Sequence, residues 1–504
     1  MSAASVLLAL ALLAVWPRRR WQWWLGMAVS ALAVVLTSSY AVADHFTGEG
    51  ITLAVLAHLL YGWRDGELGL MRFPWVAAGV LAGLLGWMLW GWWCWRLMRG
   101  RARAQKKPWQ WLALPVGGVA ILSNPAAQDL WLLQRTTEHQ GQALNAELQW
   151  DVKPGSGRPR PFVWIYLESL ERAFLDQERL PGVAPGLAVL EQENLSFRGI
   201  ATAPFMNWTV AGMVASQCGM PFEPLGKQGT GYKAGAACLG DWLSDHGYVL
   251  SYVGGADLAF SGKGRFYRRQ GFSTVLGFDD LKGDAKAHSV WGVYDDVVFA
   301  RAQREFMRLK QSGQLFGLVI LTTATHPPEG YVSASCRDRE NFGNPMLGAV
   351  HCSDGQVVEL VRWLQANGPN DLLIILGSAH LQVAGSAHDI LRRAARRENT
   401  LIVLGAGQGV VDRPATMVDV APTVAELLGF DARAIGLGRS LLRKAPTLTE
   451  AYGYGKLISM LPGWRVSLRE GDSYALCQRQ SHAQPKAEGA SWHITQALCK
   501  TEDH

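Results

Sequence analysis

Four side chains suited to binding a cation or attacking a phosphorus atom stand beside apolar runs in the latter part of the chain. Glu168, His326 and His380 each follow such a run, and Thr209 stands in NWTVAGMVASQCGMP, where a polar start leads into small residues. A threonine hydroxyl is a poor nucleophile at neutral pH unless a metal lowers its pKa. Glutamate and histidine supply the oxygen and nitrogen ligands that suit manganese or zinc. The set predicts metal-assisted attack by the Thr209 hydroxyl on a phosphodiester.

Each of these residues also has a purely structural explanation. Glu168 fits a carboxylate at the start of a helix, where the helix dipole favours negative charge. Thr209 fits a helix N-cap. His326 precedes two prolines and fits a loop histidine, whereas His380 fits a buried histidine whose hydrogen bonds are satisfied. The residue types alone leave both kinds of explanation open.

The apolar runs indicate the elements that must position these side chains. Each run is short and rich in Val, Ile and Leu, as strands are when helices cover both faces of their sheet. The runs are 162–167, 248–254, 315–323, 371–377 and 400–405. They predict an α/β domain over 161–445. Open α/β sheets bind ligands beyond the carboxyl ends of their strands, which is where Glu168, His326 and His380 stand.

The composition indicates that another part of the chain lies in a membrane. Of the 504 residues 18% are charged and 49% are apolar, with 22 Trp, whereas a soluble domain carries about a quarter charged residues. This balance excludes a disordered chain and a small disulfide scaffold. An α-helical membrane domain over 1–125 is expected, followed by a linker over 126–160, and a small C-terminal extension is expected over 446–504. The four expected spans are 4–16, 21–43, 73–95 and 109–122.

The charges between the apolar stretches predict the orientation. The basic runs 18–20 and 96–107 stay on the cytoplasmic side under the positive-inside rule, so the α/β domain faces the opposite compartment. A cleaved signal peptide carries its positive charges before the apolar stretch, but here the arginines 18–20 follow it. The run 96–107 joins two apolar stretches, so a membrane explains it better than a nucleic-acid partner.

Six of the seven cysteines fall in the region expected outside the cytoplasm. They form three neighbouring pairs, which is typical of an oxidising compartment. Zinc ligation is the alternative, although the chain has no CxxC. The six are Cys218, Cys238, Cys336, Cys352, Cys477 and Cys499.

Several motifs, in order along most of residues 1–445, resemble one family. It comprises the membrane phosphoglycerol transferases that modify periplasmic glucans, relatives of lipoteichoic acid synthase in the alkaline phosphatase and sulfatase superfamily. The resemblance implies a multi-pass protein of the bacterial inner membrane with an alkaline-phosphatase-like domain in the periplasm. It also implies phosphatidylglycerol, a membrane lipid, as donor and a periplasmic glucan as acceptor. The motifs are DHFTGEGI (44–51), IYLESLER (165–172), NWTVAGMVASQCGMP (207–221), CLGDWL (238–243), GGADLAFSGK (254–263), WGVYDD (291–296), THPPEGY (325–331), GSAHL (377–381) and IGLGRSLL (435–442).

The resemblance also assigns roles to individual residues. It implies a manganese or magnesium ion, with zinc less expected, held by Glu168, Thr209 and His380. It implies the disulfides Cys218–Cys238 and Cys336–Cys352, whereas a Cys477–Cys499 link is expected from proximity in the sequence alone. The substrate contacts implied are Lys263 and His326, with Trp291, Asp295 and Asn207 as further members of the pocket.

The chain departs from the family pattern at two positions. The family carries Asp-His in a motif of the form SDHL, but here Ala379 precedes His380, and Asn207 stands where an acid is usual. Losing a carboxylate that faces a dication weakens metal binding. Three explanations stay open: an engineered inactive variant, a natural pseudoenzyme that binds lipid or glucan, and a displaced ligand such as Asp389. A lipid-binding or glucan-binding scaffold, a phosphatase and a phosphoethanolamine transferase are the alternative functions.

Overall fold

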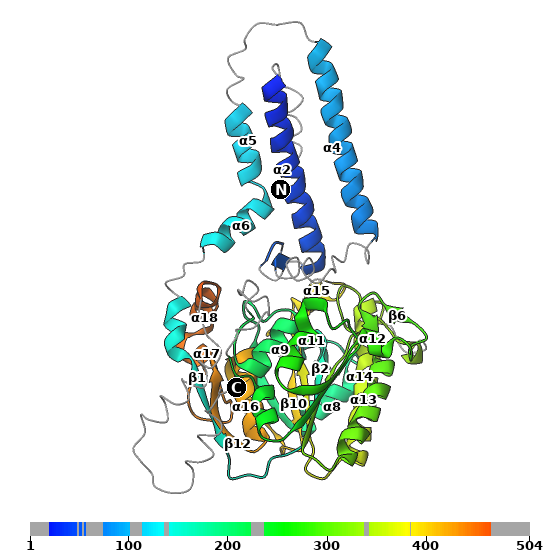
Figure 1. Ribbon diagram of the computed structural model, residues 1–504, viewed down its shortest axis with the longest axis vertical. Helices are drawn as coiled ribbons and strands as arrows, with labels where there is room; N and C mark the ends of the chain where they lie inside the picture. The colour runs from blue at the N-terminus through cyan, green and yellow to red at the C-terminus, as the bar shows by residue number, and fades with distance from the viewer. Residues whose placement is uncertain are drawn as a thin grey trace, which may run out of the picture. The chain divides into compact units, whose positions relative to one another are not determined.

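The chain divides into two compact units, Met1–Thr136 and Thr137–His504. The computed structural model describes residues 20–47, 50–52, 55–56, 74–100, 113–135, 141–222, 236–336, 342–383 and 385–464 (Figure 1). The expected first span, 4–16, and the expected Cys477–Cys499 link lie outside these residues.

Four helices make up the described part of the first unit. The longest, α2, contacts each of the other three. Two polar contacts fix their packing: the Trp87 indole donates to Ser30 Oγ at 3.0 Å, and the Asn124 amide donates to Thr37 Oγ1 at 2.8 Å. The helices are α2 (Arg20–Thr47), α4 (Pro74–Gly100), α5 (Ala113–Leu122) and α6 (Pro125–Arg135).

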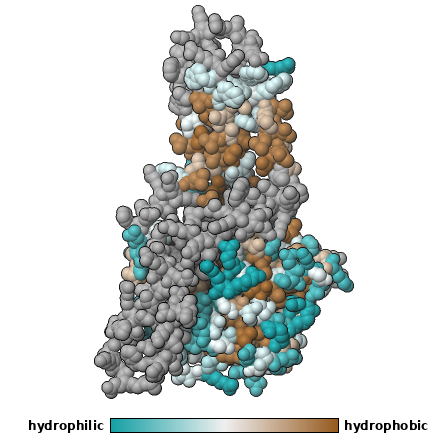
Figure 2. Space-filling model, in the orientation of Figure 1, coloured by the Kyte–Doolittle hydropathy of each residue, from teal (hydrophilic) through white to brown (hydrophobic). Residues whose placement is uncertain are grey.

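One helix among the described residues, Trp21–Asp44, is long and apolar enough to cross a membrane. The expected run 21–43 is helical, the described helix of the run 73–95 begins at Pro74, and that of the run 109–122 begins at Ala113. Apolar side chains gather on the surface of this unit (Figure 2), and exposed large residues such as Trp24, Leu32 and Leu89 belong to its helices. Among the described helices, one therefore supports a membrane domain, whereas four spans were expected.

An eight-stranded sheet forms the centre of the second unit. All five strands expected from the apolar runs are present, so the predicted α/β fold is confirmed. The sheet also contains β3, β5 and β11, which the sequence did not indicate. Its strands, in order across the sheet, are β11 (Gly409–Thr416), β3 (Leu195–Ala201), β10 (Leu401–Leu404), β9 (Leu373–Ser378), β2 (Phe162–Leu167), β8 (Phe316–Leu321), β4 (Val249–Gly254) and β5 (Phe272–Leu276).

The three central strands run in the same direction and end together. β2 is parallel to β9 on one side and to β8 on the other, with Leu167 opposite Ser378 and Tyr166 opposite Leu321. The residues that follow these strands therefore emerge at one edge of the sheet. β10 departs from this pattern because it is antiparallel to both β9 and β3.

Helices cover both faces of the sheet (Figure 1). On one face, alternate strand residues such as Val163 and Ile165 are fully buried in a core shared with α8, α13 and α14. Burying each such side chain contributes about 2 kcal/mol. On the other face, Tyr166 Oη lies 2.7 Å from Ser216 Oγ and accepts from Gln217 Nε2 at 3.1 Å, which fixes α9 to the sheet. The main helices are α8 (Pro185–Glu193), α9 (Thr209–Cys218), α10 (Leu239–Asp245), α11 (Lys263–Arg269), α13 (Asp295–Gln311), α14 (Pro345–Asn367) and α16 (Val420–Leu427).

Short elements complete the second unit. Its helices are α12 (Phe278–Leu281), α15 (His388–Leu391), α17 (Leu448–Tyr452) and α18 (Tyr454–Met460), and its 3-10 turns are η3 (Ala143–Glu147), η4 (Arg172–Leu175), η5 (Phe260–Gly262), η6 (Ala334–Cys336), η7 (Met417–Asp419) and η8 (Leu461–Gly463). Its smaller sheets contain β1 (Gln149–Pro154), β12 (Phe430–Gly436) and β13 (Gly438–Arg439), and β6 (His288–Ser289) with β7 (Gly292–Val293).

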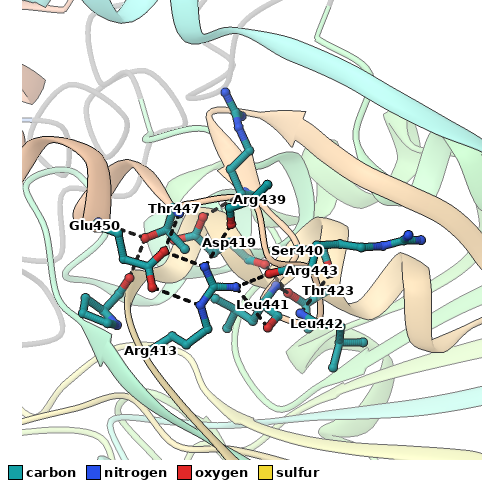
Figure 3. Close-up of polar contacts among 12 residues, drawn as sticks. Arg413, Asp419, Thr423, Arg439, Ser440, Leu441, Leu442, Arg443, Thr447 and Glu450 are labelled. Atoms are coloured by element: carbon teal, nitrogen blue, oxygen red, sulfur yellow. Dashed lines mark hydrogen bonds and ion pairs between the residues drawn. The ribbon is translucent and has the colours of Figure 1, made fainter.

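Figure 3 shows a polar cluster that includes Arg413, Asp419, Arg439 and Glu450. The Asp419 carboxylate, in the turn η7 that packs on α9, accepts from the backbone N–H of Thr416 at 2.9 Å and of Arg439 at 2.8 Å. The Arg413 guanidinium donates to Glu450 Oε1 of α17 at 3.0 Å. These contacts hold the segment after β13 against η7 and β11. Because η7 packs on α9, they also help to keep α9 in place.

Part of the expected linker is folded into the second unit. Residues 143–154 form η3 and β1, and β1 pairs with β12. The Arg439 guanidinium donates to the Glu147 carbonyl at 2.7 Å, and the Trp464 indole donates to Asn145 Oδ1 at 2.8 Å. Residues 141–154 are therefore held by side chains from the end of the described chain.

Both disulfides that the resemblance implied are present. Cys218–Cys238 joins the end of α9 to the start of α10 across 20 residues, and Cys336–Cys352 joins η6 to α14 across 16. Cys94 is buried in the first unit.

Replacing both Cys218 and Cys238 with alanine is expected to lower the free energy of unfolding of the second unit by about 3 kcal/mol, because the unfolded chain gains the entropy of an open loop. Thermal unfolding of the full chain in detergent measures this loss. Cys94→Ala is the control and is expected to melt as the unmodified chain does. An unchanged melting temperature for the double variant would contradict a stabilising disulfide.

Candidate active site

The ends of β2 and β9 bring Glu168 and His380 together. Leu167 pairs with Ser378, and each candidate follows one of these residues closely along its strand. His380 Nε2 lies 3.0 Å from Glu168 Oε1, and the two residues are 3% and 2% exposed. Glu168 precedes a turn rather than an α-helix, so the explanation as a helix-terminal carboxylate is wrong.

Thr209 joins this pair from the first turn of α9. Its Oγ1 donates to Glu168 Oε1 at 3.2 Å and lies 3.5 Å from His380 Nε2. The N-cap position belongs to Trp208, so the N-cap explanation for Thr209 is wrong. Thr209 is half-buried, which leaves it partly accessible.

A close backbone approach places Thr209 beside the strand ends. A Cβ on Gly212, in the first turn of α9, would lie 1.6 Å from the carbonyl oxygen of Ala379. Only glycine lets the helix lie this near to the backbone after β9. Gly212 therefore sets the separation between Thr209 and His380.

Ser169 is a member of the cluster that sequence reasoning missed. It is fully buried, and its Oγ lies 3.0 Å from Glu168 Oε1 and 3.3 Å from His380 Nε2. Its backbone is left-handed with φ 50°, a conformation that costs a non-glycine residue about 1–2 kcal/mol. The signal in the sequence was a hydroxyl directly after a strand-end carboxylate.

Both histidines are oriented by the carbonyl group of the next residue. His380 Nδ1 lies 2.7 Å from the Leu381 oxygen, and His326 Nδ1 lies 2.8 Å from the Pro327 oxygen. A carbonyl oxygen only accepts, so Nδ1 carries the proton in both rings. The Nε2 atom of His380 is thereby directed at Glu168 and Thr209.

His326 lies close to Trp291 and Lys263. The Trp291 and His326 rings stack with centroids 3.9 Å apart. Lys263 begins α11 and is 2% exposed. Burial lowers the pKa of His326 against the attraction of Glu168, and the Lys263 charge lowers it further. A neutral imidazole beside a buried ammonium group suits contact with a phosphate.

Asp295 holds the loop that carries His326. Its carboxylate accepts from the backbone N–H of Thr323 at 2.7 Å and of Ala324 at 3.2 Å. Burial raises the pKa of Asp295 to about 6 although these hydrogen bonds oppose the change. Asp295, expected to line the pocket, thus contacts the loop backbone directly.

Three further positions bear on the site. Ala379 is fully buried, and its N–H donates to the Leu167 carbonyl at 3.0 Å, which continues the pairing of β9 with β2. Asn207 is half-buried in the turn before α9. Asp389, considered as a displaced ligand, is exposed in α15 and is thus separate from the buried pair of Glu168 and His380.

The Glu168 carboxylate is held as an anion. Burial alone would raise its pKa, but the charge and hydrogen bond of His380, together with the Ser169 hydroxyl, lower it to about 2. So weak a base does not hold a proton taken from a threonine hydroxyl. Glu168 is therefore suited to attracting a cation rather than to general base catalysis.

The cluster fits a divalent cation, although only in part. Neighbouring ligands about 2.1 Å from one ion are about 3.0–3.4 Å apart at octahedral and tetrahedral angles. The separations of Glu168 Oε1 from the His380 and Thr209 atoms, 3.0 and 3.2 Å, match this spacing. Over the described ranges, however, no group of three or more His, Cys, Asp or Glu side chains is arranged to hold a metal ion. The set offers one carboxylate and one imidazole with hydroxyl groups, so it predicts weak binding.

Comparison with known families agrees with this fold. The sulfatase family profile matches residues 160–430, and the chain belongs to the sulfatase family. The profile described as "Phosphoglycerol transferase I, N-terminal domain" matches residues 1–141. A protein of the alkaline phosphatase superfamily from Vibrio parahaemolyticus shares the fold, with a TM-score of 0.50 and 20% identity over 63% of this chain and 80% of that one.

The curated relatives include proteins named phosphoglycerol transferase I. The one from Xanthomonas axonopodis pv. citri is 34% identical over 468 residues, and the one from Salmonella paratyphi B is 32% identical over 476. These alignments cover 88% and 89% of this chain but 64% and 61% of the relatives. The chain therefore spans less than two thirds of their length. The family resemblance drawn from the motifs is confirmed.

Gly212→Ala is expected to lower the free energy of unfolding by about 1–3 kcal/mol, because the added methyl group overlaps the Ala379 carbonyl and forces α9 outward. Thermal unfolding measures the loss. Gly455→Ala in α18, where a Cβ meets nothing within 4 Å, is the matched control. Equal melting temperatures for the two variants would refute the close approach.

Proposed function

We propose that the second unit transfers a phosphoglycerol group from phosphatidylglycerol to a hydroxyl group of a periplasmic glucan, with Thr209 as the nucleophile. The observation that carries this proposal is the convergence of Thr209 Oγ1 on Glu168 Oε1 and His380 Nε2 at 3.2 and 3.5 Å. The transferase relatives support the class of reaction.

The reaction proceeds in two balanced steps. Thr209 Oγ forms a bond to the phosphorus atom of the lipid headgroup, the bond to diacylglycerol breaks, and diacylglycerol leaves with a proton. The acceptor hydroxyl then attacks the glycerophosphoryl-threonine, and the threonine hydroxyl is restored. The covalent intermediate thus divides one difficult phosphodiester exchange into two easier steps.

A divalent cation, manganese or magnesium rather than zinc, supplies the activation that Glu168 lacks, because a bound dication lowers the pKa of a hydroxyl group. Glu168, His380 and the Thr209 hydroxyl are the residues that hold it. His326 and Lys263 contact the non-bridging phosphate oxygens. The first turn of α9 adds backbone N–H groups without helical partners beside the phosphate. Trp291 keeps the His326 ring in place by stacking on it.

The donor lipid implies a location at the bacterial inner membrane, with the second unit in the periplasm. The apolar helix Trp21–Asp44 supports a membrane anchor, and the two disulfides support an oxidising compartment. The multi-pass arrangement with four spans is part of this proposal. It places the site on the side of the membrane where glucan accumulates.

Ala379 favours a second candidate function. Without a carboxylate at this position the site carries one negative charge from Glu168, which suits weak cation binding and slow turnover. In the limit of no turnover the protein captures the lipid headgroup or the glucan without transferring anything. The two functions differ in whether glycerol phosphate reaches the acceptor.

Thr209→Val is expected to abolish both transfer and the covalent intermediate, because the valine side chain keeps the shape of threonine without its hydroxyl group. Mass spectrometry of the chain incubated with labelled phosphatidylglycerol detects the intermediate. Thr209→Ser is the control and is expected to retain a measurable rate. A labelled adduct on the Thr209→Val chain would rule out this nucleophile.

Ala379→Asp is expected to tighten manganese binding at least about tenfold and to raise the transfer rate, because it restores an anionic ligand facing the cation. Ala379→Asn, which has a similar shape and no charge, is the control. A transfer rate in the unmodified chain equal to that of Ala379→Asp would refute the assigned cost of Ala379. Tighter binding without transfer would favour the capture function.

A further inference from the structure

We infer that the Ser169 hydroxyl is a cation ligand that takes up part of the role left by the missing carboxylate at position 379. The inference rests on the proposed cation at Glu168 and His380 and extends it to a residue to which the family resemblance assigns no role. It also gives the described site a fourth donor atom, since Asp389 is exposed and separate from the buried cluster.

The first observation is that Ser169 and Thr209 have the same two neighbours. Ser169 Oγ lies 3.0 Å from Glu168 Oε1 and 3.3 Å from His380 Nε2. The corresponding distances from Thr209 Oγ1 are 3.2 and 3.5 Å. All four distances match those between neighbouring ligands of one small dication, about 3.0–3.4 Å, to within about 0.1 Å. The two hydroxyl groups are thus equivalent toward the proposed ion.

The second observation is that four polar atoms converge at one place. Ser169 Oγ, Thr209 Oγ1 and His380 Nε2 all lie within hydrogen-bonding distance of Glu168 Oε1. Because Nδ1 of His380 carries a proton, Nε2 is the ring atom left to bind a cation. Each of the four atoms has a lone pair that it can direct at one ion.

The third observation is that the chain holds Ser169 in an unfavourable conformation. Its φ of 50° lies in the left-handed region, and the turn is closed by a hydrogen bond from the Glu171 N–H to the Ser169 carbonyl at 3.2 Å. The side chain is fully buried beside Glu168, so the unfavourable backbone conformation does not serve to present a group to solvent. Backbone strain of this kind persists where the surrounding structure requires a particular side-chain position.

The test measures Mn²⁺ affinity, by electron paramagnetic resonance, of the full chain in detergent. Ser169→Ala is expected to raise the Kd about tenfold or more, since one ligand is removed. Ser169→Gly removes the same hydroxyl and relieves the left-handed strain, so an equal loss identifies the hydroxyl rather than the backbone. Ser353→Ala, which removes another fully buried hydroxyl, in α14, is the control and leaves the Kd unchanged.

A double-variant cycle with Ala379→Asp completes the test. The Ser169→Ala effect is expected to shrink when an aspartate at 379 supplies a stronger ligand, and this coupling supports the inference. An unchanged Kd for both Ser169 variants overturns it, as does a full recovery of affinity in Ser169→Gly. If Mn²⁺ affinity depends on Ser169 but Ala379→Asp transfers no glycerol phosphate, the ligand stands and the proposed function falls.

Discussion

The site depends on one buried atom, the Oε1 oxygen of Glu168. It lies within 3.2 Å of Ser169 Oγ, Thr209 Oγ1 and His380 Nε2. An anion with so little water around it is costly unless positive charge or hydrogen bonds surround it. The sheet edge, the first turn of α9 and the turn after β2 each contribute a group that meets this requirement. Their positions are therefore linked, because all three stabilise the same buried negative charge on Glu168.

The parallel order of β9, β2 and β8 turns three distant segments into one site. The strands end at a common edge, so Glu168 and His380, 212 residues apart, need no long side chains to meet. α9 adds Thr209 from a different part of the chain. Two contacts fix the position of α9. Gly212 lies against the Ala379 backbone, and the η7 turn, which Asp419 stabilises, packs on the same helix. Position 379 thus affects the site through its backbone as well as its side chain.

Sequence reasoning identified the strands whose residues are buried on both faces, because such strands are continuous apolar runs. It missed β3, which contains Arg198 and Gly199, and β11, where exposed and partly buried residues alternate around Pro414. The candidate residues after β2, β8 and β9 could be predicted because strand ends are readable. Ser169 follows Glu168 directly in the sequence, but its contact with His380 depends on a left-handed backbone that the sequence does not show. The role of Asp295 in holding the Thr323 and Ala324 backbone was likewise visible only in three dimensions.

Each imidazole is aimed by the carbonyl group of the residue that follows it, Leu381 for His380 and Pro327 for His326. In many metal sites a carboxylate from elsewhere in the protein does this work, so two positions must be preserved together. Here the orientation of each ring depends on only two adjacent residues, the histidine and the residue whose carbonyl group it contacts. Sequence changes that leave this local backbone in place therefore leave the orientation of both rings unchanged.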